Sequence, residues 1–580
     1  MVRVIGGGDS LSTLLERASI TSQAKADADA ENDRVEPAEA VASAQGEYRQ
    51  MTGALYSEGY YGGTVSVRVD GREAADLSLV NPPERVSQVV IDIRPGPRFR
   101  FSRAAIAPRA PDTFLPDGYA AGETARSGLI QEAVTGQIEG WRNAGHAKVV
   151  LSQERITANH ANNTLDSDLR VNPGPRLTFG PLIVTGNNRV RTERIVAIAG
   201  LPTGEVYNPE ELDDAAARLR RTGAFRGVTL KDAEEIGPGD TLPIVAEIAE
   251  EKRRRLGAGV EFSTTEGIGV TSFWMHRNLF GGAENLRFDL DILNIAAPED
   301  DNGIDYFFTA VLRRPATPVT DVDTFFVFSA SREEEPAFTS TTYGLGGGVE
   351  WFVSNELTLS AGILFQYQDI EDAFGERETE SLLFPLAATY DTRDDEFDAT
   401  RGFFFSAEVT PFVGFRDSAS GTHVLLDGRT YYGFGEERNV VLAGRAQIGS
   451  LTGPNISEAP TDFLFFAGGG GSVRGQPFQV LGAGEEDGDI FGGRSYLALS
   501  GEVRAYVRGP LGVVGFYDAG YVGAEELYDG SGEWISGAGI GLRYDTGFGP
   551  IRVDVGTPVI EADDTDPDPV QIYIGIGQAF

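Results

Sequence analysis

The glycine-rich run at residues 468–475 is the segment of this chain that looks most like a ligand-binding loop. It consists of Gly468-Gly469-Gly470-Gly471-Ser472-Val473-Arg474-Gly475. A phosphate-binding loop ends in Lys followed by Ser or Thr, which hold the phosphate and its magnesium ion, whereas this run ends in Val-Arg-Gly. A second run, at 537–541, lies within an alternating strand pattern and opens no helix, so it predicts strand glycines. Neither run indicates nucleotide chemistry.

Catalytic and metal-binding side chains are equally sparse. The chain has no cysteine and no Gly-x-Ser-x-Gly sequence. Its four histidines are scattered without the spacing of metal ligands; they are His146, His160, His276 and His423. Acidic clusters at 485–489 and 561–568 could bind calcium weakly, because hard cations favour carboxylate oxygens, but solvated loops are the favoured interpretation. We therefore expect no catalytic, cofactor-binding or metal-binding residue, and a protein that is not an enzyme.

The composition excludes one class of partner and favours a β-rich fold. The formal charge of −38 argues against nucleic-acid binding, which needs Lys and Arg gathered on one face. The chain contains 73 Gly, 34 Phe and 19 Tyr, residue types that suit turns and strands. Its 580 residues predict three or four domains at about 150 residues each.

Three segments in the first 250 residues share one plan, in which a helix ends, a glycine follows and a strand begins. They lie at 54–61, 141–146 and 221–225. In the third, Asn208 can cap a helix that begins at Pro209. Gly223 can end that helix in a left-handed conformation, which a side chain would hinder. The plan predicts a repeated β-α-α-β-β unit.

Alternating strands accompany these helices. Val65, Val67 and Val69 alternate with polar residues, as do Val89, Ile91 and Ile93 less cleanly. A Pro-Gly-Pro-Arg phrase at 95–98 recurs 78 residues later at 173–176, an interval that indicates one module. We expect units at 1–97, 98–176 and 177–252, the first with a shortened N-terminus. Three generic α+β domains are the alternative.

From about Arg254 onward, short alternating runs replace the helical period. In one run, Leu286, Phe288, Leu290 and Ile292 alternate with Arg287, Asp289 and Asp291. In a transmembrane barrel the apolar face meets lipid, the polar face lines a wet lumen, and closure leaves no unpaired edge. At about ten residues per strand plus loops, residues 253–580 predict sixteen antiparallel strands. A soluble sandwich or propeller is the alternative.

The two ends of the chain bear on export. Residues 1–12 lack a basic segment followed by an apolar one, so no signal peptide is visible, and we expect the numbering to begin after a missing leader. Phe580 closes the last alternating run and resembles the C-terminal β-signal of bacterial outer-membrane proteins. The sequence contains no run of about eighteen apolar residues, so it predicts no transmembrane helix.

Two motifs resemble the superfamily of BamA, TamA and the two-partner-secretion transporters. The first is Val473-Arg474-Gly475, and the second, about 40 residues later, is Phe516-Tyr517-Asp518-Ala519-Gly520. In that family the first motif lies at the tip of the sixth extracellular loop, inside the barrel, and its Arg pairs with the Asp of strand thirteen. The resemblance therefore implies that Arg474 meets Asp518. Counting alternating runs back from the C-terminus makes 511–522 strand thirteen of sixteen. Gln476 stands where the family usually has an aromatic residue, a place that Phe478 could take.

The same resemblance implies an architecture and a function. The α+β units resemble POTRA domains, and three of them favour the TamA subfamily, because BamA has five and the two-partner transporters have two. The implied protein is a bacterial outer-membrane barrel with periplasmic POTRA repeats that helps to insert or translocate substrates such as autotransporters. Its implied partners are a TamB-like inner-membrane-anchored protein, unfolded outer-membrane proteins and lipid, with no nucleic acid.

Two physical routes could support such a function. Exposed POTRA strand edges can capture extended peptide by β-augmentation. A weak seam between the strand near Leu256–Ser263 and the strand ending at Phe580 could open sideways or thin the nearby bilayer. Two other functions stay open. One is a pore that exports a dedicated protein, and the other is an outer-membrane phospholipase or protease, which would need a Ser/His or paired acidic site.

Overall fold

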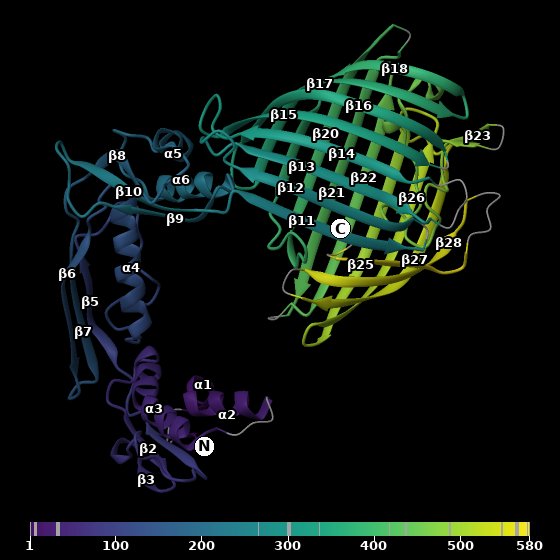
Figure 1. The fold of residues 1–580 in the computed structure, drawn as a ribbon. Helices are drawn as coiled ribbons and strands as arrows, with labels where there is room; N and C mark the ends of the chain where they lie inside the picture. The colour runs from purple at the N-terminus through teal and green to yellow at the C-terminus, as the bar shows by residue number, and fades with distance from the viewer. Residues whose placement is uncertain are drawn as a thin grey trace. The chain divides into compact units, whose positions relative to one another are not determined.

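The computed structural model describes residues 2–580 apart from 5–7, 31–34, 265, 298–302, 336, 417, 436–437, 487–488, 547–548, 563–567, 577 and 579–580. The chain forms two compact units. One consists of Met1–Ile183, Leu201–Asp213 and Leu230–Val245, and the other of Val184–Gly200, Asp214–Thr229 and Ala246–Phe580. Small α+β modules make up the N-terminal part, and a β-barrel makes up the C-terminal part (Figure 1).

The first module packs helices on a four-stranded sheet of order β1-β4-β2-β3, in which β1 runs parallel to β4. Its elements are β1 (Val2–Val4), α1 (Asp9–Ala18), α2 (Ile20–Ala30), α3 (Pro37–Ser57), β2 (Thr64–Val69), β3 (Arg72–Glu73), a 3-10 turn at Ala74–Asp76 and β4 (Val89–Arg94). Val67 and Ile91 from the two predicted strands are buried against Leu15 and Met51 of the helices. The predicted alternation of these strands is confirmed.

The second module has a three-stranded sheet of order β5-β7-β6. Its elements are β5 (Arg100–Ala107), α4 (Ser127–Asn143), β6 (Val150–Asn159) and β7 (Thr164–Asn172). Residues 98–176 are all described, and they form one helix where the repeat plan predicts two. Pro108, Pro111 and Pro116 explain the difference, because proline removes a helical hydrogen bond and clashes with the preceding turn.

The third module has a sheet of order β8-β10-β9. Its elements are β8 (Thr178–Thr185), α5 (Thr192–Ala199), α6 (Pro209–Arg221), β9 (Phe225–Asp232) and β10 (Thr241–Glu250). Oδ1 of Asn208 accepts the backbone N–H of Glu210 at 3.1 Å, and Gly223 has a φ of +66°. The predicted cap and the predicted left-handed stop are both confirmed.

The C-terminal half forms a closed antiparallel barrel. Its elements are β11 (Arg254–Ser263), β12 (Gly267–Arg277), β13 (Asn285–Ile295), β14 (Asp305–Arg314), β15 (Val322–Glu335), β16 (Phe338–Phe352), β17 (Leu357–Asp372), β18 (Gly375–Leu383), β19 (Leu386–Asp391), β20 (Arg401–Phe415), β21 (Gly421–Phe434), β22 (Val440–Thr452), β25 (Ser495–Arg508), β26 (Leu511–Gly523), β27 (Glu533–Asp545), β28 (Pro550–Ile560) and β29 (Gln571–Ile576). Of these seventeen elements, β18 and β19 form one strand, since both pair with β17 and with β20. Pro385, which lacks an N–H, lies at the break. The predicted count of sixteen strands is confirmed.

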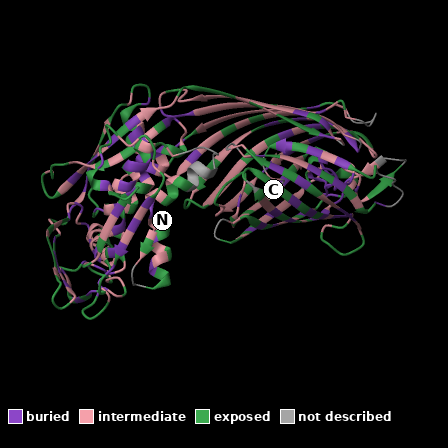
Figure 2. Cartoon of the chain, turned by 90° about the horizontal axis from the view of Figure 1, so that it is seen from below, coloured by how far each residue is buried: buried purple, intermediate pink, exposed green. Residues whose placement is uncertain are grey.

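Exposed and buried residues alternate along β26, and burial also varies from residue to residue along other barrel strands (Figure 2). In β26, Val513 and Tyr517 are exposed, whereas Phe516 and Asp518 are buried. On the outer face, four aromatic rings lie in sequence across β12 to β15, with centroids 5.6, 6.0 and 6.3 Å apart; they belong to Trp274, Phe288, Phe308 and Phe328, and the first two pairs are stacked while the third is tilted. An apolar outer face of this kind suits contact with lipid.

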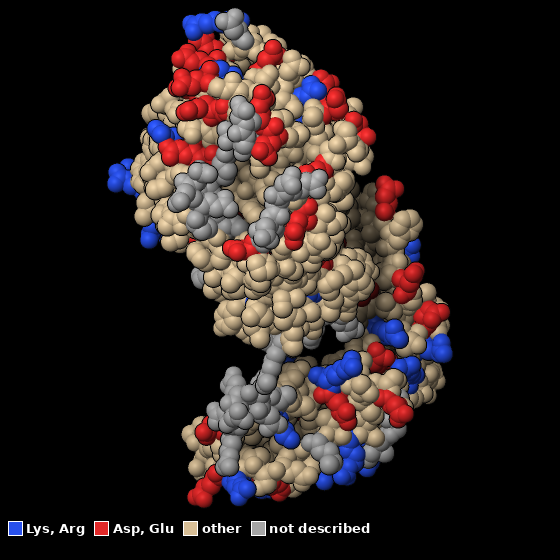
Figure 3. All heavy atoms as spheres, turned by 90° about the vertical axis from the view of Figure 1, so that its right-hand side faces the viewer, with Lys and Arg blue, Asp and Glu red and all other residues tan. Residues whose placement is uncertain are grey.

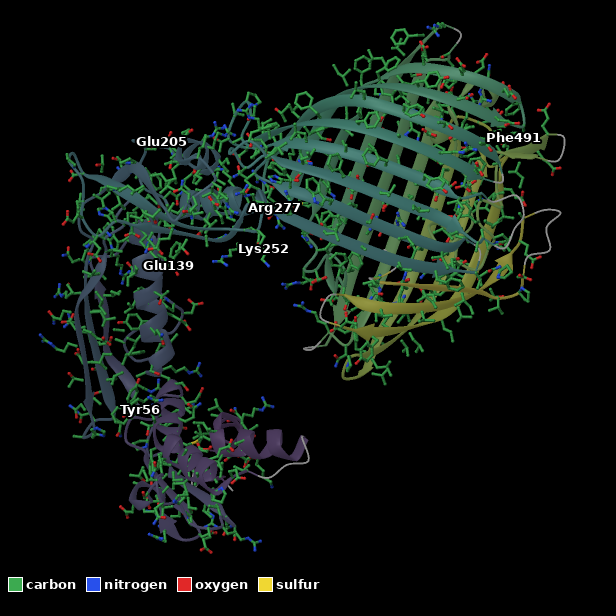
Figure 4. All side chains as sticks on the ribbon, viewed as in Figure 1. Tyr56, Glu139, Glu205, Lys252, Arg277 and Phe491 are labelled. Carbon is green, nitrogen blue, oxygen red and sulfur yellow. The ribbon has the colours of Figure 1, made fainter. Side chains whose placement is uncertain are left out.

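The two ends of the barrel differ. At one end, Arg277 donates from Nη1 to the carbonyl of Lys252 at 3.2 Å, and at the other end lies Phe491 (Figure 4). Phe491 belongs to a hairpin of β23 (Gly484–Glu486) and β24 (Asp489–Phe491), and its ring lies 5.2 Å from that of Phe374. Asp and Glu gather on this end of the barrel (Figure 3). Among the described residues, no helix has both the length and the apolar character needed to cross a membrane.

Candidate functional site: the lumenal loop and the barrel seam

The segment between β22 and β25, residues 453–494, folds into the barrel, and we call it the lumenal loop. The carboxylate of Asp462 in this loop accepts hydrogen bonds from the amides of Gln366 at 3.1 Å and Gln368 at 2.6 Å, both on β17. Further along, Arg474 contacts β25, β26 and β28. Because β17 is the seventh strand and β26 the thirteenth, the loop crosses the lumen from one wall to the other.

Arg474 lies at the centre of a buried ion-pair network. Its Nε donates to Oδ2 of Asp518 at 2.7 Å, and its Nη2 donates to Oδ1 at 3.0 Å. The third nitrogen, Nη1, donates to Glu502 at 2.7 Å and to Asp554 at 3.4 Å. All four side chains are at most 3% exposed. A two-pronged Arg–carboxylate pair of this kind is strong and fixes geometry.

Two more arginines complete the network. Nε of Arg504 donates to Oε2 of Glu502 at 2.8 Å, and Arg543 donates to Asp554 through both terminal nitrogens. Three guanidinium groups therefore face three carboxylates, and their formal charges cancel. This balance matters because an unpaired buried charge is strongly destabilising.

The remaining residues of the two predicted motifs fit around this pair. The guanidinium carbon of Arg474 lies 3.8 Å from the ring centroid of Phe516, which places it over the face of the ring. A side chain at Gly520 would come within 2.8 Å of Val473. Gly475 has a φ of +97°, and a side chain there would come within 2.6 Å of the carbonyl oxygen of Thr557. The structure thus brings both motifs together, and glycine is required where they touch.

Gln476, which replaces the family's usual aromatic residue, is fully buried. Its amide nitrogen donates to the carbonyls of Ser536 at 2.8 Å and Ile560 at 2.7 Å. Ser536 and Ile560 are paired with each other directly beside a register shift between β27 and β28, where the regular ladder is interrupted. Phe478 lies beside Gly469 instead. Gln476 therefore ties the loop to an irregular part of the wall, a contact that an aromatic ring could not make.

The barrel closes through a short seam between β11 and β29. Only Phe262 with Ile574 and Ser263 with Tyr573 are paired there among the described residues, whereas β11 pairs with β12 along its whole length. One side-chain bridge adds to the seam, because the hydroxyl of Thr264 donates to Gln571 at 2.8 Å and accepts the N–H of Ile572 at 2.9 Å. The predicted seam strands thus adjoin, and Phe580, the predicted β-signal, lies outside the described residues.

Several residues of this site were not predicted from the sequence. Glu502, Arg504, Arg543 and Asp554 complete the Arg474 network, and Tyr573 contacts the loop tip. The available signal was a charged residue on the lumenal face of a late strand, as in Glu502-Val503-Arg504. That pattern assigns a face of the wall but no partner. Within the described part of the chain, no group of three acidic or histidine side chains is placed to hold a metal ion, and most of 561–568 lies outside it.

A second cluster fixes the end of β10 just before the barrel begins. One carboxylate oxygen of Glu250 accepts the backbone N–H groups of Asn188, Arg189 and Val190 at 2.8, 2.7 and 2.9 Å. The other oxygen accepts Nε of Arg189 at 2.6 Å. Burial raises the pKa of Glu250, but the backbone donors and the Arg189 guanidinium outweigh burial and lower it to about 2.

This lowered pKa predicts a loss of stability in acid. Because the folded-state pKa lies below the ordinary 4.5, the ionised carboxylate stabilises the fold above that pH. Its contribution is lost as the pH falls from about 4.5 to about 2. We expect Glu250→Gln to lower the thermal unfolding midpoint at pH 7, and the difference from the parent to shrink towards pH 3. Glu247→Gln, on an exposed position of the same strand, is the control, and equal pH profiles for parent and Glu250→Gln would contradict the assignment.

Comparison with known proteins places this architecture in a family. The Omp85 superfamily domain matches residues 278–580, and the POTRA family, described as a surface antigen variable number repeat, matches 177–251. The outer membrane protein assembly factor BamA of Nitratidesulfovibrio vulgaris is 25% identical over 423 residues, which cover 69% of this chain and 51% of that protein. The chain thus spans about half the length of this curated relative.

Two solved structures share the fold. BamA from Haemophilus ducreyi lacking POTRA domains 1–3 superposes with a TM-score of 0.64 at 15% identity, covering 82% of this chain and all of that one. CdiB from Acinetobacter baumannii gives a TM-score of 0.53 at 12% identity, covering 83% and 90%. The Omp85 match spans just over half of the sequence and includes the lumenal loop and every strand from β13 to β29. The chain belongs to the Omp85 superfamily.

Proposed function

We propose that this chain is an outer-membrane assembly factor that helps to insert other β-barrel proteins at its seam. The observation that carries the proposal is the seam itself, where, among the described residues, only two residue pairs and the contacts of Thr264 join β11 to β29. Cross-strand pairs contribute about 0.2–1 kcal/mol each. Opening two such pairs therefore costs less free energy than separating any other two neighbouring strands of the barrel, which are joined by more pairs.

An open seam offers an edge to a substrate strand. Residues 254–261 of β11 pair with β12 on one side and have no strand partner on the other among the described residues. Their backbone groups can pair with an incoming strand in the same way as in β-augmentation. In a bilayer such groups have no water to bond with, so a substrate strand is their natural partner.

A groove in the second module suits capture of an unfolded substrate. It has a volume of about 580 Å³ and lies between α4 and β6, where Ile130, Val134, Leu151, Ile156 and Ala158 line it. β6 is an edge strand of its sheet. An extended peptide could therefore add a strand to β6 and place alternate apolar side chains in the groove.

The proposal extends to the subfamily and its partners. We place POTRA domains at 1–97, 98–176 and 177–252 and the barrel at 253–580, supported by the three separate sheets and the closed wall. Three POTRA units favour the TamA subfamily, with autotransporter-like substrates, the units in the periplasm and a TamB-like inner-membrane-anchored partner. The alternative of a dedicated secretion pore is less well supported, since the buried lumenal loop crosses the channel.

Reconstitution tests the proposal directly. Liposomes that contain the full chain should fold a urea-denatured outer-membrane barrel faster than liposomes that contain an unrelated porin, as measured by heat-modifiable electrophoretic mobility. Ile156→Asp should slow the reaction about tenfold, because the groove would have to bury a carboxylate. Ile156 is already 40% exposed, so the fold should tolerate the change. Thr157→Asp, at the next position of β6 and pointing to the other face, is the matched control. Equal folding rates with this chain and with the porin would contradict the proposal.

A further inference from the structure

The tip of the lumenal loop holds the last strand of the barrel through Tyr573. The backbone N–H of Gly475 donates to the hydroxyl of Tyr573 at 3.0 Å, and Tyr573 is 4% exposed. A side chain at Gly470 would come within 3.2 Å of the same ring, so the glycine backbone packs on it. Tyr573 is also one of the two β29 residues paired with β11, where it faces Ser263. One residue thus joins the seam to the loop.

The same tip contacts the other side of the seam. Glu266 lies in the turn between β11 and β12, and its carboxylate adjoins the tip glycines. A side chain at Gly469 would come within 3.0 Å of Oε1, and one at Gly470 within 3.6 Å of Oε2. Gly469 and Gly470 allow this close approach, because a side chain at either position would press against Glu266 or Tyr573.

A third contact fixes the tip of the loop to the barrel wall, so that the tip does not move with either strand of the seam. Arg474 is held by carboxylates on β25, β26 and β28. The tip is therefore fixed to the wall beside the seam while it contacts Tyr573 and Glu266. Among the described residues, two residue pairs and the contacts of Thr264 join the seam strands directly, so these inner contacts add substantially to what keeps the seam closed.

A cavity on the lumenal side of the seam is lined by both seam strands and by the loop. It has a volume of about 460 Å³, and its lining includes Glu261 and Phe262 of β11, Arg552 of β28, Tyr573 of β29 and Phe478 of the loop. The lining of this cavity thus joins both edges of the seam to the tip of the loop.

We propose that residues 469–475, which we call the bolt, hold the seam closed from the lumenal side. Tyr573 positions the last strand against the bolt, and Glu266 positions the first hairpin against it. This inference rests on the proposed function, because a bolt controls access only if the seam opens. A substrate or a partner that pulls on the loop then releases the bolt from Tyr573 and Glu266. This release precedes entry of a substrate strand into the seam.

Hydrogen–deuterium exchange of the full chain in detergent, without substrate, tests the bolt. Tyr573→Phe removes only the hydroxyl that accepts the Gly475 N–H. We expect exchange in peptides that cover 254–264 and 571–576 to rise about fivefold, the factor given by the loss of one net hydrogen bond. Peptides within 533–545 should not change. Tyr521→Phe is the matched control, since Tyr521 on β26 accepts the N–H of Gly532 at the same 3.0 Å and lies away from the seam.

A second variant covers the other edge. Glu266→Ala should speed exchange in the same two peptides and leave the Tyr521 region unchanged. If neither variant speeds seam exchange beyond the Tyr521→Phe control, the bolt is refuted. Faster seam exchange in a protein that does not accelerate substrate folding would uphold the bolt and refute the proposed assembly function, so the two ideas fail separately.

Discussion

Replacing Arg474 with alanine is expected to lower the yield of folded barrel and to destabilise what folds by about 3–5 kcal/mol, the cost of breaking a buried ion pair. The loss is large because three carboxylates share this guanidinium: Asp518, Glu502 and Asp554. Glu502 and Asp554 keep Arg504 and Arg543, whereas Asp518 forms an ion pair with Arg474 alone among the described residues. Heat-modifiable mobility and thermal unfolding in detergent measure the effect.

Two further variants separate charge from packing. Arg474→Lys keeps the charge but cannot form the two-pronged pair, so it should recover only part of the stability. Adding Asp518→Asn to Arg474→Ala removes the stranded carboxylate and should recover part of it as well. Arg287→Ala is the control, because Arg287 pairs with Asp289 on a lumenal face but is 42% exposed and should cost less than about 1 kcal/mol. A stability of Arg474→Ala equal to that of the control would disprove the central role of this arginine.

A disulfide across the seam is expected to abolish assembly of substrate barrels. Phe262 and Ile574 are direct partners on the outer face, and paired residues of antiparallel strands lie within disulfide range. The chain has no cysteine of its own, so Phe262→Cys with Ile574→Cys forms the single disulfide. Substrate folding in the liposome assay should fall to the porin level when this variant is oxidised and return when it is reduced.

The control for this experiment uses the same cysteine at position 574. Val553 pairs with Ile574 from the other side, on β28, so Val553→Cys with Ile574→Cys ties β29 to its ordinary neighbour. That disulfide should leave assembly unchanged under both conditions. If the seam disulfide also leaves assembly unchanged, insertion does not pass between β11 and β29. A secretion pore, which acts through its lumen, would likewise be insensitive to the seam disulfide.

The barrel was readily predicted because its physics is local. Alternation of Leu286, Phe288 and Leu290 with charged residues indicates a strand with two different environments, and the count of such runs indicates the strand number. The break at Pro385 also follows from a single residue, because proline cannot donate to the ladder. In the second module, the three prolines between β5 and α4 carried the same kind of local signal, which the repeat plan masked.

The partners within the lumen were harder to predict. A period of two assigns Glu502 and Asp554 to the inner face, but it does not say at which height along the wall each lies or what crosses the lumen to meet it. The pairing of Arg474 with Asp518 came from family resemblance, not from spacing. Tyr573 carries no signal at all in the sequence, since its role depends on where a loop about a hundred residues earlier comes to rest.

The four aromatic rings that contact one another across β12 to β15 have a mechanical consequence. Aromatic pairs add about 0.5–1.5 kcal/mol beyond their buried area, so these four strands should move as one stiff plate. The compliance of the wall is then unequal around its circumference. A force that acts on the seam therefore deforms β11 and β29 more than β12 to β15. The last strand flexes while these four strands keep their arrangement.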